Sequence, residues 1–300
     1  MRRHDLYPSR EEKPRIHERR DPVLYNDPRP SMTGLIDEAA ARFYDQNGFL
    51  HFEGLLDEEE IRRLREIARR VEQDPGAFAS DEAAIVGTES GVHSVFGAHQ
   101  SSEVIAEAAS NPKLLEIAEH LLGSTLSIYQ TRMHFEPGYD VAEERPSWRS
   151  DFETWHVEDG MARMRAVSCA ITLEEDKTRE SGLLMIPGSQ GQFIGCASPE
   201  DEVALPLLDP LTQPDEALVQ CLARDHGVAS PEGKLGSVTF FDSNIMRTWL
   251  KSHERSNRVA AAFVYNSTEN LPAAPFGGDT PRPEVISDRR ADPLPSVWCL

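Results

Sequence analysis

The chain contains 300 residues, of which 51 are acidic and 31 are basic, so its formal net charge at pH 7 is −20. A field of that sign repels nucleic-acid phosphates and anionic membranes, and we expect no nucleic-acid or membrane partner. Hydrophobic residues make up 39% of the chain, enough for an ordinary core. No apolar run approaches the ~18 residues of a membrane span. The length fits either two average domains or one β-barrel with a helical flank.

The cysteines and the first residues bear on the compartment. Cys169, Cys196, Cys221 and Cys299 show no CxxC pairing, and residues 1–22 lack the apolar stretch of a secretory signal. These features predict a cytoplasmic protein without a disulfide framework. GxGxxG, Walker and GxSxG motifs are absent from the sequence, which argues against dinucleotide, nucleotide and serine-hydrolase chemistry.

The beginning of the chain differs in composition from the rest. Its first 32 residues are rich in Arg, Pro and Asp and carry little apolar periodicity. We expect residues 1–32 to form an N-terminal arm, either flexible or laid as an extended strap over the body. The remaining residues, 33–300, are expected to form one domain.

Helical signals follow the arm. Apolar residues recur at helical spacing over 36–44, and Asn47-Gly48 closes this helix. Asp57 and Glu60 have the spacing of a capping box, which opens the strongest helix of the chain. Its apolar stripe is formed by Ile61, Leu64, Ile67, Ala68 and Val71. Two further helices are predicted at 103–109 and 112–122.

From residue 123 onward the pattern is that of strands bounded by Gly, Pro, Asn or Asp. The expected strands lie at 125–135, 166–173, 183–186, 237–241 and 258–265, after a short extended run at 49–52. A helical front half and a β-rich back half predict an α+β domain rather than repeats or an alternating βαβ sheet. Residues 197–233 are expected to form a long insertion between strands, either a lid or a solvated loop without a role.

The densest group of chemically active side chains is WRSDFETWHVEDGM at 148–161. In their order along the chain, this and other segments resemble the phytanoyl-CoA dioxygenase (PhyH) superfamily of Fe(II)/2-oxoglutarate oxygenases, and within it the ectoine hydroxylases. The segments that carry the resemblance are DLYPSR at 5–10, FYDQNGFL at 43–50, QTR at 130–132, SDFETWHVEDGM at 150–161, MRAVS at 164–168, LLMIPGS at 183–189, FFDSN at 240–244 and VYNSTEN at 264–270. The resemblance implies a double-stranded β-helix (jelly-roll, cupin-like) core with flanking N-terminal helices, and a homodimer.

The family's chemistry needs a facial triad, His-x-Asp plus a distant His, which leaves three positions of Fe(II) open for 2-oxoglutarate and O2. By resemblance, Asp151 matches the carboxylate, whereas Arg149 and Arg247 stand where the two ligand histidines would be. A guanidinium stays protonated and has no lone pair to offer a metal. We therefore expect no metal at this position and no Fe(II) cofactor, while 2-oxoglutarate stays a candidate ligand.

The three residues also suggest a local arrangement. Arg149 and Asp151 are expected two positions apart on one strand, both pointing into the barrel, with Arg247 opposite. Two guanidiniums and one carboxylate carry +1, as do Fe(II), two neutral imidazoles and one carboxylate. A buried arginine without a partner is costly, so Asp151 should bridge one or both of them.

The side that would hold the co-substrate is partly kept. Arg258 lies eleven residues after Arg247, the spacing at which the family places the arginine for the distal carboxylate of 2-oxoglutarate. Trp249 stands where ectoine hydroxylases have a Ser that shares this carboxylate. By the same resemblance, the positions that match the ectoine or 2-oxoglutarate cradle are Gln130, Trp155, Ala166, Ser168 and Phe241.

Two further positions depart from the ectoine hydroxylases. Ala262 replaces an aromatic residue of the cradle, and His134 replaces an inner-barrel Asn. Together with Arg132 and the other arginines, the pattern predicts a cationic interior inside an acidic protein. We expect this interior to bind a small dianion such as 2-oxoglutarate, another carboxylate or a phosphate, without redox chemistry.

Three function classes stay open, and whether the chain is an enzyme is one of the questions. The first is a catalytically silent ectoine-hydroxylase-like protein, a pseudoenzyme that binds a small anion or pairs with an active homologue as a heteromer. Another is a purely structural or interaction protein, for which the interior would not matter. The retained Arg258, Trp155 and Ser168 favour the silent anion-binding protein over this structural class.

The remaining class is an active 2-oxoglutarate-dependent hydroxylase of an ectoine-like substrate with a relocated iron site. Asp151 and His134 would supply ligands, joined by His156 or Glu158. A lone inward histidine is more often a hydrogen-bonded core residue, and His156 and Glu158 occur in the family motif without being its ligands. The remaining histidines without ligand spacing are His93, His99 and His253.

Overall fold

The computed structural model describes residues 5–78, 84–88, 91–136, 147–174, 182–197, 213–231, 234–250, 258–277, 280–290 and 292–296. Its main element is an antiparallel sheet of seven strands. The strand order is β2 (Phe49–Phe52), β9 (Val238–Asp242), β6 (Ala166–Glu174), β11 (Arg258–Ser267), β5 (Leu126–Glu136), β4 (Gly91–Phe96) and β3 (Ala84–Thr88). The strands predicted at residues that belong to this sheet are confirmed, and β3 and β4 are additions to it that the sequence did not predict.

Two short antiparallel pairs accompany the large sheet. One joins β10 (Arg247–Leu250) to β7 (Gly182–Met185), and the other joins β1 (Ile16–Glu18) to β8 (Gln192–Ile194). Leu183 and Met185 of β7 pack with Ala170 and Phe241 of the large sheet. The β7–β10 pair therefore faces one side of the large sheet, and we call that side the interior face.

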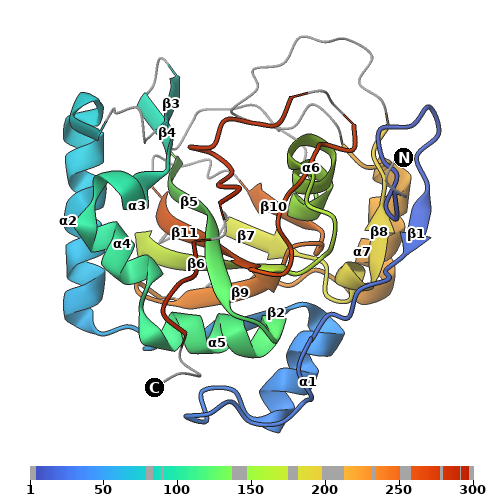
Figure 1. The fold of residues 1–300 in the computed structure, drawn as a ribbon, viewed down its shortest axis with the longest axis horizontal. Coiled ribbons are helices and arrows are strands. Elements are labelled where there is room, and N and C mark those ends of the chain that lie inside the picture. The colour runs from blue at the N-terminus through green and yellow to red at the C-terminus, as the bar shows by residue number, and fades with distance from the viewer. Residues whose placement is uncertain are drawn as a thin grey trace.

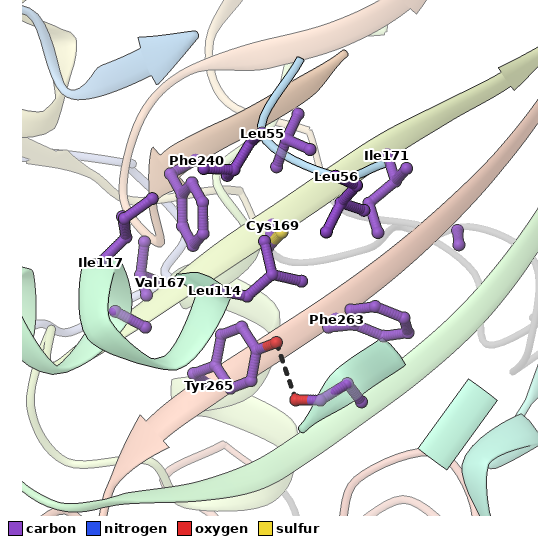
Figure 2. Close-up of a cluster of buried hydrophobic side chains, with 14 of the residues drawn as sticks. Leu55, Leu56, Leu114, Ile117, Val167, Cys169, Ile171, Phe240, Phe263 and Tyr265 are labelled. Carbon is purple, nitrogen blue, oxygen red and sulfur yellow. Dashed lines mark hydrogen bonds between the residues drawn. The ribbon is translucent and has the colours of Figure 1, made fainter. Parts of the chain in front are cut away.

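The opposite side, the helix-side face, carries the main hydrophobic core. Phe240, Cys169 and Phe263 are directly opposite one another across β9, β6 and β11, and all three are buried there. Figure 2 shows them against Leu114 of a covering helix. Tyr265 also points to this side, and its hydroxyl donates a hydrogen bond of 2.9 Å to the carbonyl of residue 109. Consecutive strand residues point to opposite sides, so the neighbours of these residues line the interior face.

The covering helices begin and end close to the predicted residues. They are α2 (Glu58–Gln73), α4 (Glu103–Ala109) and α5 (Pro112–Leu122), which lie together on one flank of the sheet in Figure 1. Both hydrogen bonds of the capping box between Asp57 and Glu60 are present, and the five predicted stripe residues are the buried residues of α2. Gly123 ends α5 at φ 56°, a left-handed conformation that glycine adopts without strain.

The other helices frame the sheet. They are α1 (Glu38–Asn47), α3 (Ala98–Ser101), α6 (Asp151–Asp159) and α7 (Glu216–His226), with the 3-10 turns η1 (Pro75–Phe78) and η2 (Ser189–Gly191). Asp37 caps α1, and Gly48 ends it at φ 80° as the sequence predicts. Among the described residues, no helix has the length and apolarity to cross a bilayer.

The N-terminal segment is a strap laid over the body. It runs from the β1–β8 pair along the edge of the molecule to α1 (Figure 1). Arg19 is buried and forms a bidentate pair with Asp242 at 2.8 and 3.0 Å. Tyr7 is fully buried, and its hydroxyl donates to Asp21 at 2.9 Å. Of the two forms that the sequence left open for the arm, the described part has the extended one.

The expectation for residues 197–233 needs a correction. Part of this stretch, residues 198–212 and 232–233, lies outside the described residues, but residues 216–226 form helix α7. Asp215 caps the helix, and Val219 is buried against Ile186, Ile194 and Met246. An amphipathic helix that packs on the body is therefore present where an irregular insertion was expected, because one apolar residue per turn is enough to anchor it.

Candidate functional site

The site begins where the chain enters α6. Arg149 pairs with Arg247 in an isolated antiparallel bridge, with both backbone N–H···O distances at 2.9 Å. Ser150 then accepts a hydrogen bond from the amide of Glu153, so the helix begins at Asp151. The expectation that Arg149 and Asp151 share one strand is therefore wrong, because the cap at Ser150 turns the chain from extended to helical between them.

Asp151 nevertheless pairs with Arg247, as expected from the cost of an unpaired buried arginine. Arg247 donates from Nε to Asp151 Oδ2 at 2.9 Å and from Nη2 to Oδ1. Both carboxylate oxygens thus accept from one guanidinium, the bidentate geometry that arginine suits best. The Arg247 guanidinium also lies 5.9 Å from the centre of the Phe241 ring. The side chains are 9% and 14% exposed for Arg247 and Asp151, so the pair is largely shielded from solvent.

The charges of four arginines act on His134 of β5. Arg132 donates from Nη2 to His134 Nδ1 at 3.0 Å, so this nitrogen is the acceptor and the neutral ring carries its proton on Nε2. Burial lowers the pKa of His134 well below its usual range, and the charges of Arg132, Arg247, Arg149 and Arg258 lower the pKa further. His134 is therefore neutral at physiological pH, and the charge of this interior comes from the guanidiniums.

Trp249 connects this histidine with Arg258. Its ring lies 5.5 Å from the His134 ring, and the Arg258 guanidinium lies 5.9 Å from the Trp249 ring centre. His93 of β4 also contacts His134, with 4.9 Å between the two imidazole centres. Sequence spacing alone does not place His93 at this site, because its position depends on the pairing of β4 with β5, where Ser94 is opposite His134.

The residues expected to cradle a small ligand separate into two groups. Gln130, Ser168 and Phe241 lie along one line of the interior face, with Val264 between the first two. Gln130 donates from Nε2 to the carbonyl of Ile286 at 2.8 Å. Ala262 on the next line is directly opposite both Ala170 and Arg132, and it keeps partial exposure to solvent.

The second group lies where α6 packs against the large sheet. Trp155 and Ala166 belong to an apolar cluster with Tyr129, Phe152 and Val264. Only 5.2 Å separates the centres of the Trp155 and Tyr129 rings. The structure thus brings Trp155 and Ala166 together, next to the line of Ser168 through their shared neighbour Val264.

His156 and Glu158 do not join His134. His156 bonds through Nδ1 to the carbonyl of Met161 at 2.7 Å and through Nε2 to Asp5 at 2.9 Å. Its ring stacks on Phe276 with the centres 4.0 Å apart. Glu158 accepts from Arg10 of the strap at 2.6 Å. Both residues therefore fasten α6 to its surroundings and lie away from the interior face.

The other histidines and acidic groups give no further ligand cluster. His99 is hydrogen-bonded through Nδ1 to Thr131 at 2.8 Å, whereas His253 lies outside the described residues. Over the described ranges of the chain, no three His, Cys, Asp or Glu side chains are grouped so that they could hold a metal ion.

Two arginines that the sequence analysis did not single out hold α6 from its ends. Arg10 pairs with Glu153 as well as with Glu158, and Arg282 pairs with the fully buried Asp159. The charges of Asp159 and Glu158 more than offset burial and keep the pKa of Arg282 high. Because the pairs join segments far apart in sequence, spacing could not have revealed them.

Comparison with known proteins identifies the family. The model of the family described as Phytanoyl-CoA dioxygenase (PhyH) matches residues 44–247. An ectoine dioxygenase from Stutzerimonas stutzeri is 35% identical over 95% of this chain and 94% of its own. One from Streptomyces avermitilis is 36% identical over 97% of this chain and 98% of its own.

Solved structures agree with this relationship. The apo crystal structure of EctD from S. alaskensis superposes with a TM-score of 0.82 at 32% identity, covering 98% of both chains. The EctD structure with 2-oxoglutarate and 5-hydroxyectoine gives 0.81 at 33% identity over 95% of both chains. The predicted double-stranded β-helix fold with its mixed helices and large antiparallel sheet is thereby confirmed. This chain belongs to the phytanoyl-CoA dioxygenase (PhyH) family, among relatives of the ectoine dioxygenases.

Proposed function

We propose that this chain is an ectoine-dioxygenase-like protein that binds a small anion, such as 2-oxoglutarate, in its arginine-rich interior without oxidising a substrate there. The observation that carries the proposal is the bidentate pair of Asp151 with Arg247. A guanidinium holds the one carboxylate that the family resemblance assigns to iron, and the family's two ligand histidines are replaced by Arg149 and Arg247.

The donor set at this place does not fit Fe(II). Both oxygens of Asp151 are engaged by Arg247, and no guanidinium nitrogen has a lone pair for a metal. A divalent cation would have to displace Arg247 while facing the guanidiniums whose charges already lower the pKa of His134. We therefore derive no oxidative step for this chain.

An anion fits the same surroundings. Arg132, Arg149, Arg247 and Arg258 all act on one neutral imidazole, and Asp151 is the carboxylate that the structure pairs with Arg247. Arginine is well suited to carboxylates and phosphates, because its planar fork matches their oxygens. The relative from S. alaskensis has been solved with 2-oxoglutarate and 5-hydroxyectoine, which supports 2-oxoglutarate as the first anion to test.

The decisive experiment measures metal content and then titrates Fe(II) and 2-oxoglutarate into the purified protein under anaerobic conditions. Positions 149 and 247 are directly opposite in an antiparallel bridge, so their side chains leave the strands on the same face. An Arg149→His/Arg247→His variant would place two imidazoles there beside Asp151. An Arg149→Lys/Arg247→Lys variant is the control, since it keeps the charge without adding ligands.

We expect the native chain to bind 2-oxoglutarate but no iron, and the histidine variant to take up about one iron per chain. The lysine control should stay free of iron. Stoichiometric iron in the native chain together with consumption of 2-oxoglutarate would contradict the proposal and favour an active hydroxylase of an ectoine-like substrate. His134→Gln would then be the variant to make, because Asp151 and His134 would have to supply the relocated site.

A further inference from the structure

Two buried polar atoms, one on the interior face and one on the β7–β10 pair that faces it, lack a hydrogen-bond partner. They are Nη1 of Arg247, whose other nitrogens serve Asp151, and Oγ of Ser168. Over the described part of the chain nothing accepts from either atom, although Arg247 is 8% and Ser168 3% exposed. Native proteins leave few such groups unsatisfied, because a buried donor without an acceptor costs free energy.

The two atoms belong to the same part of the interior. Ser168 is directly opposite Phe241 across β6 and β9, and the Arg247 guanidinium lies 5.9 Å from the centre of the Phe241 ring. Met185, which pairs with Arg247 on the small sheet, packs in one cluster with Phe241 and Ala170. Phe241 is thus a shared neighbour of both unsatisfied groups.

We propose that Arg247 Nη1 and Ser168 Oγ form a subsite for one carboxylate of a small dicarboxylate; this inference rests on the proposed function and names the residues that would select its ligand. Both groups can donate, and the guanidinium nitrogen can do nothing else. A carboxylate supplies the opposite charge and two acceptor oxygens, one for each of the two donors. A neutral amide or alcohol would satisfy the geometry but not the charge.

The charge balance favours a second carboxylate on the ligand. Asp151 already offsets the charge of Arg247, so a monocarboxylate gains little net attraction at the subsite itself. The further positive charge lies across the sheet, where Ala262 is opposite both Ala170 and Arg132. Strand β11 lies between β6 and β5, so two strand spacings of ~4.8 Å separate the backbones of β6 and β5. Between Ala170 and Arg132 the row of paired residues holds only the methyl group of Ala262. The positive charge beyond the subsite therefore favours a ligand with a second carboxylate.

The test uses succinate as the probe, because it has no keto group with which to chelate a metal. Its affinity is measured by calorimetry for the native protein and for Ser168→Ala, Arg247→Lys and Ser267→Ala. Ser267 is a fully buried serine of β11 whose hydroxyl donates to Ser124, so its replacement controls for the loss of a serine in the same sheet. Circular dichroism melting curves verify that each variant is folded.

We expect Ser168→Ala and Arg247→Lys each to weaken succinate binding about tenfold or more, because each loses a charge-assisted hydrogen bond. Ser267→Ala should bind as the native protein does, and butyrate should bind the native protein at least about tenfold more weakly than succinate. Arg247→Lys keeps the charge beside Asp151 and removes Nη1, and Ser168→Ala leaves Arg247 untouched.

The outcomes separate this inference from the proposed function. Native affinity in both Ser168→Ala and Arg247→Lys would overturn the subsite while leaving an anion-binding protein. Equal binding of butyrate and succinate would overturn the dicarboxylate class. If the native protein binds neither succinate nor 2-oxoglutarate, the proposed function fails and the subsite fails with it.

Discussion

The two faces of the seven-stranded sheet are built from the same strands and differ completely in chemistry. On the helix-side face, Phe240, Cys169 and Phe263 follow one another across three strands and pack under α5. The next residue of β9, Phe241, and the preceding residue of β6, Ser168, point to the interior face. The charges of several arginines act at that side of the sheet. The helix-side face thus holds most of the hydrophobic core, whereas polar and charged side chains gather at the interior face, so we expect substitutions on the first to cost more stability than substitutions on the second.

The largest effect should come from the helix-side face. Phe263→Ala removes a side chain that is 1% exposed and is expected to lower the free energy of unfolding by about 3 to 5 kcal/mol. Its neighbour Ala262 faces the interior and is partly exposed, so Ala262→Ser should cost about 1 kcal/mol or less. Urea unfolding followed by circular dichroism measures both. Equal losses in the two variants would show that both faces contribute equally to the free energy of unfolding.

A smaller loss of stability is expected from breaking the ion pair of Asp151 with Arg247. Asp151→Ala leaves Arg247 largely buried without its partner and should lower the free energy of unfolding by about 2 to 3 kcal/mol, less than for a fully buried pair because Asp151 is 14% exposed. Replacing both, as Asp151→Leu/Arg247→Met, should restore most of the loss, because no uncompensated charge remains. A double variant less stable than Asp151→Ala in urea would argue that the pair itself supports the fold.

His134 should make the interior face sensitive to acid. Burial and the neighbouring arginines lower its pKa well below 6.5 in the folded chain, whereas the unfolded chain takes up the proton near pH 6.5. Below that pH the unfolded state binds more protons, so stability falls as the pH falls, by at most about 1.4 kcal/mol for each pH unit.

The corresponding variant is His134→Gln, which keeps an acceptor for Arg132 and cannot titrate. Its free energy of unfolding should decrease less than that of the native chain between pH 7 and pH 5. His226→Gln, at an exposed position at the end of α7, is the control and should keep the native slope. The same slope in all three proteins would mean that His134 is charged in the folded state.

The smallest of these effects belongs to a helix end on the covered flank. Asp57→Ala removes the capping-box acceptor for the amide of Glu60 and should lower the free energy of unfolding by about 1 kcal/mol. Glu58→Gln in the same turn keeps both capping bonds and should change the free energy of unfolding by only about a few tenths of a kcal/mol. A loss for Asp57→Ala as large as that for Phe263→Ala would show that the helix end, not the core, limits stability.

The parts of the fold that local chemistry determines were predictable. Asp57 with Glu60, and the glycines at 48 and 123, act within a few residues of themselves, so the helix ends followed from the sequence. Helix α6 was missed because it is buried on nearly every side, from Phe152 to Val157, and so has no polar face to give a helical period.

The pairing of Asp151 with Arg247 was predictable, whereas the wider arrangement around it was not. Family resemblance brought Asp151, Arg247 and Arg258 together, and the rule against unpaired buried charge predicted the pair of Asp151 with Arg247. The contact of His93 with His134 depends on a strand register, and the hold of Arg10 on α6 joins residues more than one hundred positions apart. Such contacts are decided by tertiary structure and leave no local pattern.

Arg19 has a consequence for the order in which the chain assembles. Its donors meet the carboxylate of Asp242 and the backbone carbonyls of Asp21, Pro22, Met164 and Gln190. Asp242 lies 223 positions further along the chain, so Arg19 is synthesised well before this partner and can pair with it only after the residues between them have been made. The strap is therefore made before the later segments on which it docks.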